Sequence, residues 1–255
     1  MTTPLKFFII GGHGKVALSL TSQALARGHS VVSQIRQKAH ISDLPEGTQP
    51  LVESIEETEQ ARLMQLLDEH QPNVVVFAAG AGGKGGEERT WAVDRDAAIR
   101  VFDALEHSKL ASSASFRRLL VVSAIDVRGA DKSAPEWYGD KDFETAKRMR
   151  DVLGTYMAAK HAADVSLSTR TSFPWLVLRP SRLLDDPGTA RVSLAAHTTI
   201  SEPVRREDVA HTLLQLAELE KGKGDGQMWN LTQGETEIGA AVKEAAERNR
   251  TDWVG

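Results

Sequence analysis

One short stretch near the start of the chain, Leu5–Ala17, limits the possible folds more than any other, and its sequence is LKFFIIGGHGKVA. Its first half is a continuous apolar run, as expected of a strand that is covered on both faces of a parallel sheet. The run ends at two glycines, and an amphipathic stretch that is typical of a helix follows directly. This order of strand, tight turn and helix predicts a central strand of a parallel sheet.

The glycines of the turn favour a dinucleotide site. Gly11 and Gly14 lack a Cβ, so the turn can be sharp and a pyrophosphate can approach the backbone at the positive end of the next helix. Ala17 stands where the dinucleotide fingerprint allows Gly or Ala. An ordinary turn could carry the same glycines, but their position directly after the first strand favours the cofactor. The residues expected to bind it here are Gly11, Gly12, His13, Gly14, Lys15 and Val16.

The end of the second predicted strand, residues 30–35, favours NADP(H) over NAD(H). NAD sites carry an Asp or Glu about 20 residues after the glycines, and this acid holds the ribose 2′-hydroxyl. Here the chain has Arg36, and its first carboxylate is Asp43. A guanidinium can bind a 2′-phosphate through charge-assisted bonds, whereas a carboxylate would repel it. The alternative is that Arg36 and Lys38 are solvated loop charges.

Apolar strands and amphipathic helices continue to alternate along the chain. Further strands are predicted at 51–52, 74–79, 118–123, 175–178 and 227–231, and helices up to about 27 and at 56–70, 89–107, from 154 onward, 205–219 and 238–247. This alternation predicts an α/β fold of the Rossmann type, a doubly wound parallel sheet with helices on both faces. A single domain, 1–255, is expected for a chain of 255 residues.

Three segments are expected to form the substrate side of this domain: 80–90, 124–155 and 180–205. A glycine run, Gly80–Gly86, follows a buried strand, where small residues would let the backbone approach a bound cofactor. We therefore expect Ala79, Gly80 and Ala81 to contact the cofactor, and a mobile surface loop is the alternative for the later part of the run. Residues 128–150 are charged and have helix-like spacing only in their second half, so they form either a lid or an inert excursion.

Composition excludes several kinds of chemistry. The chain has no cysteine, which removes disulfides, thiolate catalysis and cysteine-based zinc sites. The net charge of −4 is modest and its charges are interspersed, so no nucleic-acid partner is expected. No apolar stretch approaches the length of a membrane span, so we expect a cytoplasmic protein without a membrane partner. No metal site is expected either, because helix capping explains the acids that lack a histidine at ligand spacing, Asp94, Asp96, Asp185 and Asp186.

Tyr156 and Lys160 are four residues apart on a predicted helix, so their side chains share one face about one turn apart. An ammonium near a phenol favours the phenolate, and we expect Lys160 to lower the pKa of Tyr156 from about 10 to about 7. This shift corresponds to about 4 kcal/mol, which a partly desolvated lysine and the positive nicotinamide could provide together. The same spacing also occurs where a tyrosine borders the core beside a surface lysine.

The motifs follow one another in a recognisable order: Gly11-x-x-Gly14-x-x-Ala17, Ser123 at a strand end, Tyr156-x-x-x-Lys160, and Arg179-Pro180 after the next strand. In this order the chain resembles the short-chain dehydrogenase/reductase superfamily. More closely, it is similar to the atypical NAD(P)-binding branch of NmrA-like and biliverdin-reductase-B-like proteins. The segments that look like that branch are AAGAGG, VDRDAAI, YMAAKHAAD, LVLRPSRLLDDPGTARV and VRREDVA, so the resemblance covers nearly the whole chain.

The resemblance implies an NADPH-dependent oxidoreductase that reduces a small carbonyl, quinone or similar conjugated substrate by hydride transfer, acting as a monomer or homodimer. Tyr156 would be the general acid, Lys160 would lower its pKa and bind the nicotinamide ribose, and Ser123 would hydrogen-bond the substrate carbonyl. Arg179 and Pro180 are expected at the cofactor. Two alternatives stay open, an NADP(H) sensor that regulates a partner without turnover, and an epimerase or dehydratase that retains its cofactor.

Overall fold

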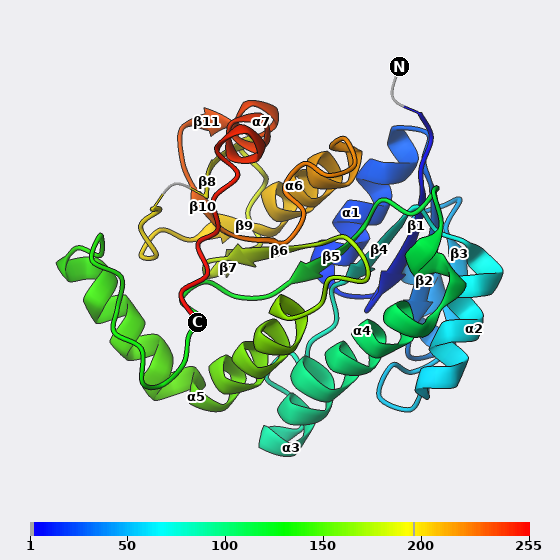
Figure 1. Ribbon diagram of the computed structural model, residues 1–255, viewed down its shortest axis with the longest axis horizontal. Coiled ribbons are helices and arrows are strands. Elements are labelled where there is room, and N and C mark those ends of the chain that lie inside the picture. Colours follow the sequence, from blue (N-terminus) through cyan, green and yellow to red (C-terminus); the bar gives the residue numbers. More distant parts are fainter. Residues whose placement is uncertain (1–2, 196) are drawn as a thin grey trace.

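A nine-stranded sheet forms the centre of the computed structural model, which describes residues 3–195 and 197–255 (Figure 1). Its strands are β1 (Lys6–Ile10), β2 (Ser30–Ile35), β3 (Gln49–Val52), β4 (Val74–Phe77), β5 (Arg118–Val122), β6 (Trp175–Pro180), β8 (Arg191–Leu194), β10 (Gln227–Gln233) and β11 (Thr236–Glu237). They are arranged in the order β11-β8-β10-β6-β5-β4-β1-β2-β3. A separate pair of short strands, β7 (Leu183–Leu184) and β9 (Val204–Arg205), lies outside this sheet.

The strand order reverses at β1. From there the chain moves outward through β2 and β3, then returns to the other side of β1 with β4 and moves outward again through β5, β6 and β10, all in parallel. Only the edge formed by β8 and β11 is antiparallel. The predicted doubly wound sheet is therefore confirmed, and the carboxyl ends of β1 and β4 border the crevice where ligands of such sheets bind.

Helices cover both faces of the sheet (Figure 1). The helical segments are α1 (Lys15–Ala26), η1 (Lys38–Asp43), α2 (Gln60–His70), α3 (Gly86–Thr90), η2 (Trp91–Ala97), α4 (Ala98–His107), η3 (Lys109–Ser112), α5 (Asp140–Ser168), α6 (Arg206–Glu218) and α7 (Ile238–Arg248). Of these, η1 and η3 are 3₁₀ helices and η2 is a π-helix. In Figure 1, α1, α6 and α7 lie above the sheet and α2, α4 and α5 below it.

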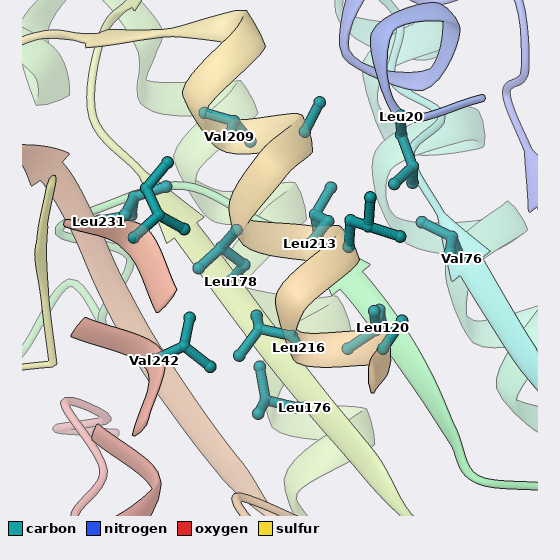
Figure 2. Close-up of a cluster of buried hydrophobic side chains, with 14 of the residues drawn as sticks. Leu20, Val76, Leu120, Leu176, Leu178, Val209, Leu213, Leu216, Leu231 and Val242 are labelled. Atoms are coloured by element: carbon teal, nitrogen blue, oxygen red, sulfur yellow. The ribbon is translucent and has the colours of Figure 1, made fainter. Parts of the chain in front are cut away.

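The core between the sheet and α6 shows why the pattern of apolar residues determines this packing (Figure 2). Leu213 and Leu216 of α6 are fully buried and face Leu176 and Leu178 of β6 and Leu120 of β5. Full burial of a leucine side chain contributes about 1.5–3 kcal/mol. Because the strands are covered on both faces, their side chains are apolar without alternation, as the sequence indicates.

Two predicted helices differ from the structure. The segment expected as one helix over 89–107 is divided into α3, η2 and α4, with the π-helix in the middle. The helix expected from Gly154 begins earlier, at Asp140, and includes the second half of the charged segment 128–150. It is broken at Leu153, whose φ of −120° and ψ of 23° are not helical. The Tyr156–Lys160 pair therefore lies just after a break in a longer helix.

Candidate cofactor and active site

The glycine turn between β1 and α1 fits tightly against its neighbours. Gly11 has a φ of +82°, and a Cβ there would lie 2.6 Å from the Cα and N atoms of Ala79. The amide of Gly12 donates to the carbonyl of Gln34 at 2.9 Å, and the amide of Gly14 donates to the carbonyl of Gly11 at 2.9 Å. The turn therefore packs directly against the backbone that follows β4, and this close approach requires glycine at its first position. A hydrogen bond also joins the turn to the end of β2.

The amino end of α1 is suited to an anion. Gly14 is the capping residue, no side chain caps the helix, and no acid occurs in its first turn. Its first backbone N–H groups are thus not satisfied within the helix and carry the positive end of the helix dipole. A Cβ on Gly14 would meet only the carbonyls of Gly11 and Ala78, at 3.2 and 3.8 Å. The residues of this turn therefore fit a pyrophosphate group.

The zone expected to select the cofactor is polar and exposed. The Arg36 side chain is exposed and lies 3.6 Å from Glu56, whose carboxylate is held more closely by Arg89 at 2.8 Å. His13 stacks on His40 with 3.7 Å between ring centroids, and its Nε2 lies 2.8 Å from Asp43. Burial and the neighbouring charges of His13 and Arg36 lower the pKa of His40. Lys15 points elsewhere and forms an ion pair with Asp185 at 2.6 Å.

Side chains from the helices that follow hold the backbone of the second glycine run. The amide of Ala81 donates to Asp94 Oδ2 at 3.0 Å, and Arg89 Nη1 donates to the carbonyls of Ala81 and Lys84 at 3.1 and 3.2 Å. Ala79 and Ala81 are buried, whereas Gly80 is exposed beside them. Contacts within the protein thus fix the first part of the run, and four of its later glycines, Gly82, Gly83, Gly85 and Gly86, have positive φ.

Lys160 occupies the centre of the candidate active site and is buried. Its Nζ lies 3.1 Å from Asp94 Oδ1 and donates to the carbonyl of Val122 at 3.2 Å, so it is anchored at the carboxyl end of β5. The same Nζ lies 5.8 Å from the ring centroid of Tyr156 and 6.0 Å from that of Phe77. The structure therefore brings Tyr156 and Lys160 together, and it adds Asp94 to the pair.

The pKa of Tyr156 does not shift in the expected direction. Burial raises it, the positive charge of Lys160 lowers it, the charges of Asp94 and Asp164 raise it further, and the result lies above the ordinary value of 10.0. For Lys160, burial acts to lower the pKa, but the charges of Tyr156, Asp94 and Asp164 outweigh it and the pKa is raised. Lys160 thus acts on the pKa of Tyr156 in the expected direction, but burial and the two carboxylates outweigh it, and neither effect could be predicted from the spacing of the pair.

Ser123 and Arg179 belong to a buried network around Asp164 of α5. The Ser123 hydroxyl donates to Asp164 Oδ2 at 2.9 Å. Arg179 donates to the same oxygen at 3.0 Å through Nη2 and at 3.3 Å through Nε. Its Nη2 also donates to the carbonyl of Val127, and its guanidinium lies 4.8 Å from the ring centroid of Trp253. The Ser123 proton is therefore used inside the protein, and Arg179 is 1% exposed.

Segments on the expected substrate side contact one another. In residues 124–155, the Tyr138 hydroxyl donates to Asp126 at 2.9 Å, and burial raises the pKa of Tyr138 to about 12. Asp142 accepts from the amides of Ile200 and Ser201 at 2.9 and 3.1 Å. Pro180 is buried at the end of β6, and its carbonyl accepts from Ile125 at 3.0 Å. These contacts join 124–155 to 180–205 over the carboxyl ends of β5 and β6.

Asp94 is the site residue whose role the sequence analysis misassigned. Capping was expected to explain it, but it is 1% exposed and paired with Lys160. One signal in the sequence could have indicated that Asp94 is buried, although not its partner, because Asp94 falls on the same helical face as Ala97, Ala98 and Val101. A carboxylate on an apolar face needs a buried partner. Asp164 and Trp253 were not singled out at all.

Within residues 3–195 and 197–255, no group of three or more acidic, histidine or cysteine side chains is placed to hold a metal ion. In the same ranges, no helix combines the length and the apolar character needed to cross a membrane.

Comparison with known proteins agrees with this geometry. A family model described as NAD(P)H-binding matches residues 11–220. The UPF0659 protein C216.03 of Schizosaccharomyces pombe is 40% identical over 213 residues, 83% of each chain, and the uncharacterized sugar epimerase YhfK of Bacillus subtilis is 28% identical over 94% of this chain and all of its own.

Solved structures share the fold. A putative NAD-dependent epimerase/dehydratase from Bacillus halodurans has a TM-score of 0.74 with 26% identity, covering 94% of this chain and 99% of its own. The anaerobillin reductase ChuY from Escherichia coli O157:H7 has a TM-score of 0.67 with 21% identity, covering 89% and 97%. A short-chain dehydrogenase/reductase from Veillonella parvula in complex with NADP has a TM-score of 0.66 with 18% identity, covering 92% and 97%. The chain therefore belongs to the NAD(P)H-binding family and has the Rossmann-type fold of the atypical short-chain dehydrogenases/reductases.

Proposed function

We propose that the protein is an NADP(H)-dependent oxidoreductase that reduces a small carbonyl, quinone or similar conjugated substrate. The observation that carries this proposal is the pair of the partly buried Tyr156 and the buried Lys160, anchored at the carboxyl end of β5 by the Val122 carbonyl 3.2 Å from Lys160. The next two strands after β5 in the same sheet are β4 and then β1, and a glycine segment follows the carboxyl end of each. A cofactor lying along this edge would have its reactive end near the phenol.

The residues of the two glycine segments would hold the cofactor. The turn Gly11–Val16 and the open amino end of α1 would bind the pyrophosphate, and Ala79, Gly80 and Ala81 would line its path along the sheet edge. Arg36 would bind the 2′-phosphate, for which it must turn from Glu56, 3.6 Å away. When bound, the reduced nicotinamide supplies the hydride.

Tyr156 would give its proton to the substrate oxygen as negative charge develops there. The raised pKa of Tyr156, caused first by burial, keeps the phenol neutral at physiological pH, which is the form that an acid requires. Lys160 is charged under the same conditions and would stabilise the phenolate that remains. The proton of each reduction would thus come from Tyr156, and a proton from solvent would restore the phenol before the next turnover.

The role first expected for Ser123 changes. Its single proton is donated to Asp164 at 2.9 Å and is not available to a substrate carbonyl in this arrangement. We propose that Ser123 supports α5 from the end of β5 through Asp164. Stabilisation of the substrate oxygen would then depend on Tyr156.

The experiment that tests the proposed function is a screen of NADPH oxidation against aldehydes, quinones and flavins, with NADPH binding measured by calorimetry on the same protein. Turnover with at least one class, lost or strongly reduced in Tyr156→Phe, is the expected result. Tight NADPH binding without turnover would instead favour a sensor of the NADP(H) ratio.

A second candidate is an epimerase or dehydratase that retains its cofactor. The names of the Bacillus subtilis and Bacillus halodurans relatives favour it, and the same Tyr156–Lys160 pair could support it. Conversion of a nucleotide sugar without net NADPH oxidation would select this candidate over the reductase.

A further inference from the structure

The two carboxylate oxygens of Asp94 contact two different parts of the site. Oδ2 accepts a hydrogen bond from the amide of Ala81 in the second glycine run at 3.0 Å. Oδ1 lies 3.1 Å from Nζ of Lys160 on α5. The side chains of Asp94 and Lys160 are 1% and 5% exposed, so solvent does not screen this ion pair. One acid thus connects the segment expected at the cofactor to the lysine of the catalytic pair.

The surroundings of Asp94 are shaped to accept its carboxylate. A buried charge is costly unless it is paired and hydrogen-bonded, and here Asp94 has both kinds of partner. The residue lies within η2, and π-helical segments are rare and frequently occur at functional sites. At Gly80, a Cβ would lie 3.0 Å from Asp94 Oδ1, which is tighter than nine in ten real contacts of this kind. Glycine at position 80 therefore leaves room for the acid.

We propose that Asp94 is a positioning residue, which fixes the Lys160 ammonium at the end of β5 and joins it to the second glycine run. The importance of this role for catalysis rests on the proposed function. The contacts of Asp94 with Lys160 and Ala81 are independent of it. Asp94 would hold the cofactor-binding backbone and the proton-donating pair in one arrangement. It would act through Lys160 and Ala81 without touching the substrate.

Several charged groups act on this centre. Lys160 is influenced by Asp94 from η2 and by Tyr156 and Asp164 from α5, and its other close contacts are the Val122 carbonyl of β5 and the Phe77 ring of β4. The negative charge of Asp94 raises the pKa of both Lys160 and Tyr156. Removal of this charge should therefore lower both pKa values.

The test uses the fact that the chain has only two tyrosines, Tyr138 and Tyr156. A Tyr138→Phe background leaves one phenol, whose ionisation is followed by its phenolate absorbance. Adding Asp94→Asn keeps an amide oxygen for the Ala81 N–H and removes the charge. The titration midpoint of Tyr156 should fall by about one pH unit or more. Circular dichroism defines the pH range in which each protein stays folded.

The matched control is Asp96→Asn in the same background. Asp96 lies two residues further along η2, its side chain is 46% exposed, and it pairs with Arg95. Its removal should leave the midpoint nearly unchanged, since exposed charges are screened by solvent and salt. If Asp94→Asn does not fold, Gly80→Ala is the second variant: its Cβ would lie 3.0 Å from Asp94 Oδ1, so the carboxylate must shift by a few tenths of an ångström, and the midpoint should fall in the same direction by a smaller amount.

The proposal would be overturned if the Tyr156 phenol titrated with the same midpoint in the parent, in Asp94→Asn and in Gly80→Ala. It would also be overturned if the phenol did not ionise in any of these proteins before they unfold at alkaline pH. This titration needs neither substrate nor cofactor, so its result is independent of the proposed function. Where turnover is found, the alkaline limb of kcat/KM should move to lower pH in Asp94→Asn by the same amount as the phenol midpoint.

Discussion

Tyr156 carries the chemical step in the proposed reaction, and its replacement by Phe removes one hydroxyl while the ring volume is kept. Turnover with a carbonyl substrate should fall about 10²–10⁴-fold, the usual contribution of a positioned acid. NADPH affinity measured by calorimetry should change little. In the parent, the loss of activity at high pH should lie above 10.0, the ordinary pKa of a phenol, because burial raises that of Tyr156. A near-normal kcat in Tyr156→Phe would falsify the acid role and point to proton supply from solvent.

Replacement of Ser123 should affect stability and leave turnover nearly unchanged, the opposite of what is expected for Tyr156. Ser123→Ala removes a buried donor to Asp164, 2.9 Å away, and should cost about 1–3 kcal/mol of stability in urea unfolding. Turnover of the folded variant should stay close to that of the parent. A drop as large as that of Tyr156→Phe would return Ser123 to the substrate carbonyl.

Arg36 determines cofactor choice in the proposal. Arg36→Ala removes one or two charge-assisted bonds to a 2′-phosphate, each contributing about 1.5–3 kcal/mol. The preference for NADPH over NADH, measured by calorimetry, should shrink at least about tenfold, since 1.4 kcal/mol corresponds to a factor of ten. Lys38→Ala, two residues away and also exposed, is the control. Equal affinity of the parent for both nucleotides would contradict the assignment.

At the scale of elements, two glycines of the turn before α1 should have different roles, Gly11 in the fold and Gly14 in cofactor binding. Gly14→Val adds a Cβ that would lie 3.2 and 3.8 Å from the carbonyl oxygens of Gly11 and Ala78, and the backbone there is extended with a φ of −64°, which valine can adopt. NADPH affinity should therefore fall far more than stability, because the branched side chain occupies the approach of the pyrophosphate. Calorimetry and thermal unfolding on the same protein measure the two effects.

Gly11→Ala is the contrasting variant in that turn. Its Cβ would lie 2.6 Å from backbone atoms of Ala79, at a φ of +82°, so the fold itself should be strongly destabilised. Unchanged NADPH binding by a folded Gly14→Val protein would show that the whole turn is structural.

The central strands could be predicted from the sequence because they are buried on both faces and therefore read as unbroken apolar runs. The edge strands β8 and β11 could not, since RVSL and TE carry no such signal and depend on pairing with β10 and with each other. The start of α5 at Asp140 could not be predicted either, because its first turns are charged and mostly exposed and therefore lack a continuous apolar face.

In the candidate site, only the arrangement of residues that are close together in the sequence could be predicted. The spacing of Tyr156 and Lys160 places them on one helical face, and the structure agrees. The pairing of Lys160 with Asp94 joins residues that are 66 positions apart, and no local pattern encodes it. The packing around Tyr156, whose desolvation raises the pKa of the phenol, likewise depends on the whole fold.

At the scale of the whole molecule, stability should depend on the core between β6 and α6 more than on the site. Leu213→Ala leaves a cavity at a fully buried position and should lower the free energy of unfolding by about 2–5 kcal/mol. Val165→Ala on α5 is the control, because that side chain is 41% exposed and its loss should cost less than about 0.5 kcal/mol. If Leu213→Ala and Val165→Ala lowered the free energy of unfolding in urea by similar amounts, the prediction would be contradicted.

The close approach of position 80 to Asp94 also bears on how this chain can evolve. A side chain at 80 and an acid at 94 compete for the same space, with 3.0 Å between a Cβ and Oδ1, so the two positions do not mutate independently. An alanine at 80 would crowd the acid, and replacing the acid by a smaller residue would relieve the crowding but remove the proposed partner of Lys160. Position 80 is therefore constrained by its neighbour even where the cofactor would tolerate a larger residue.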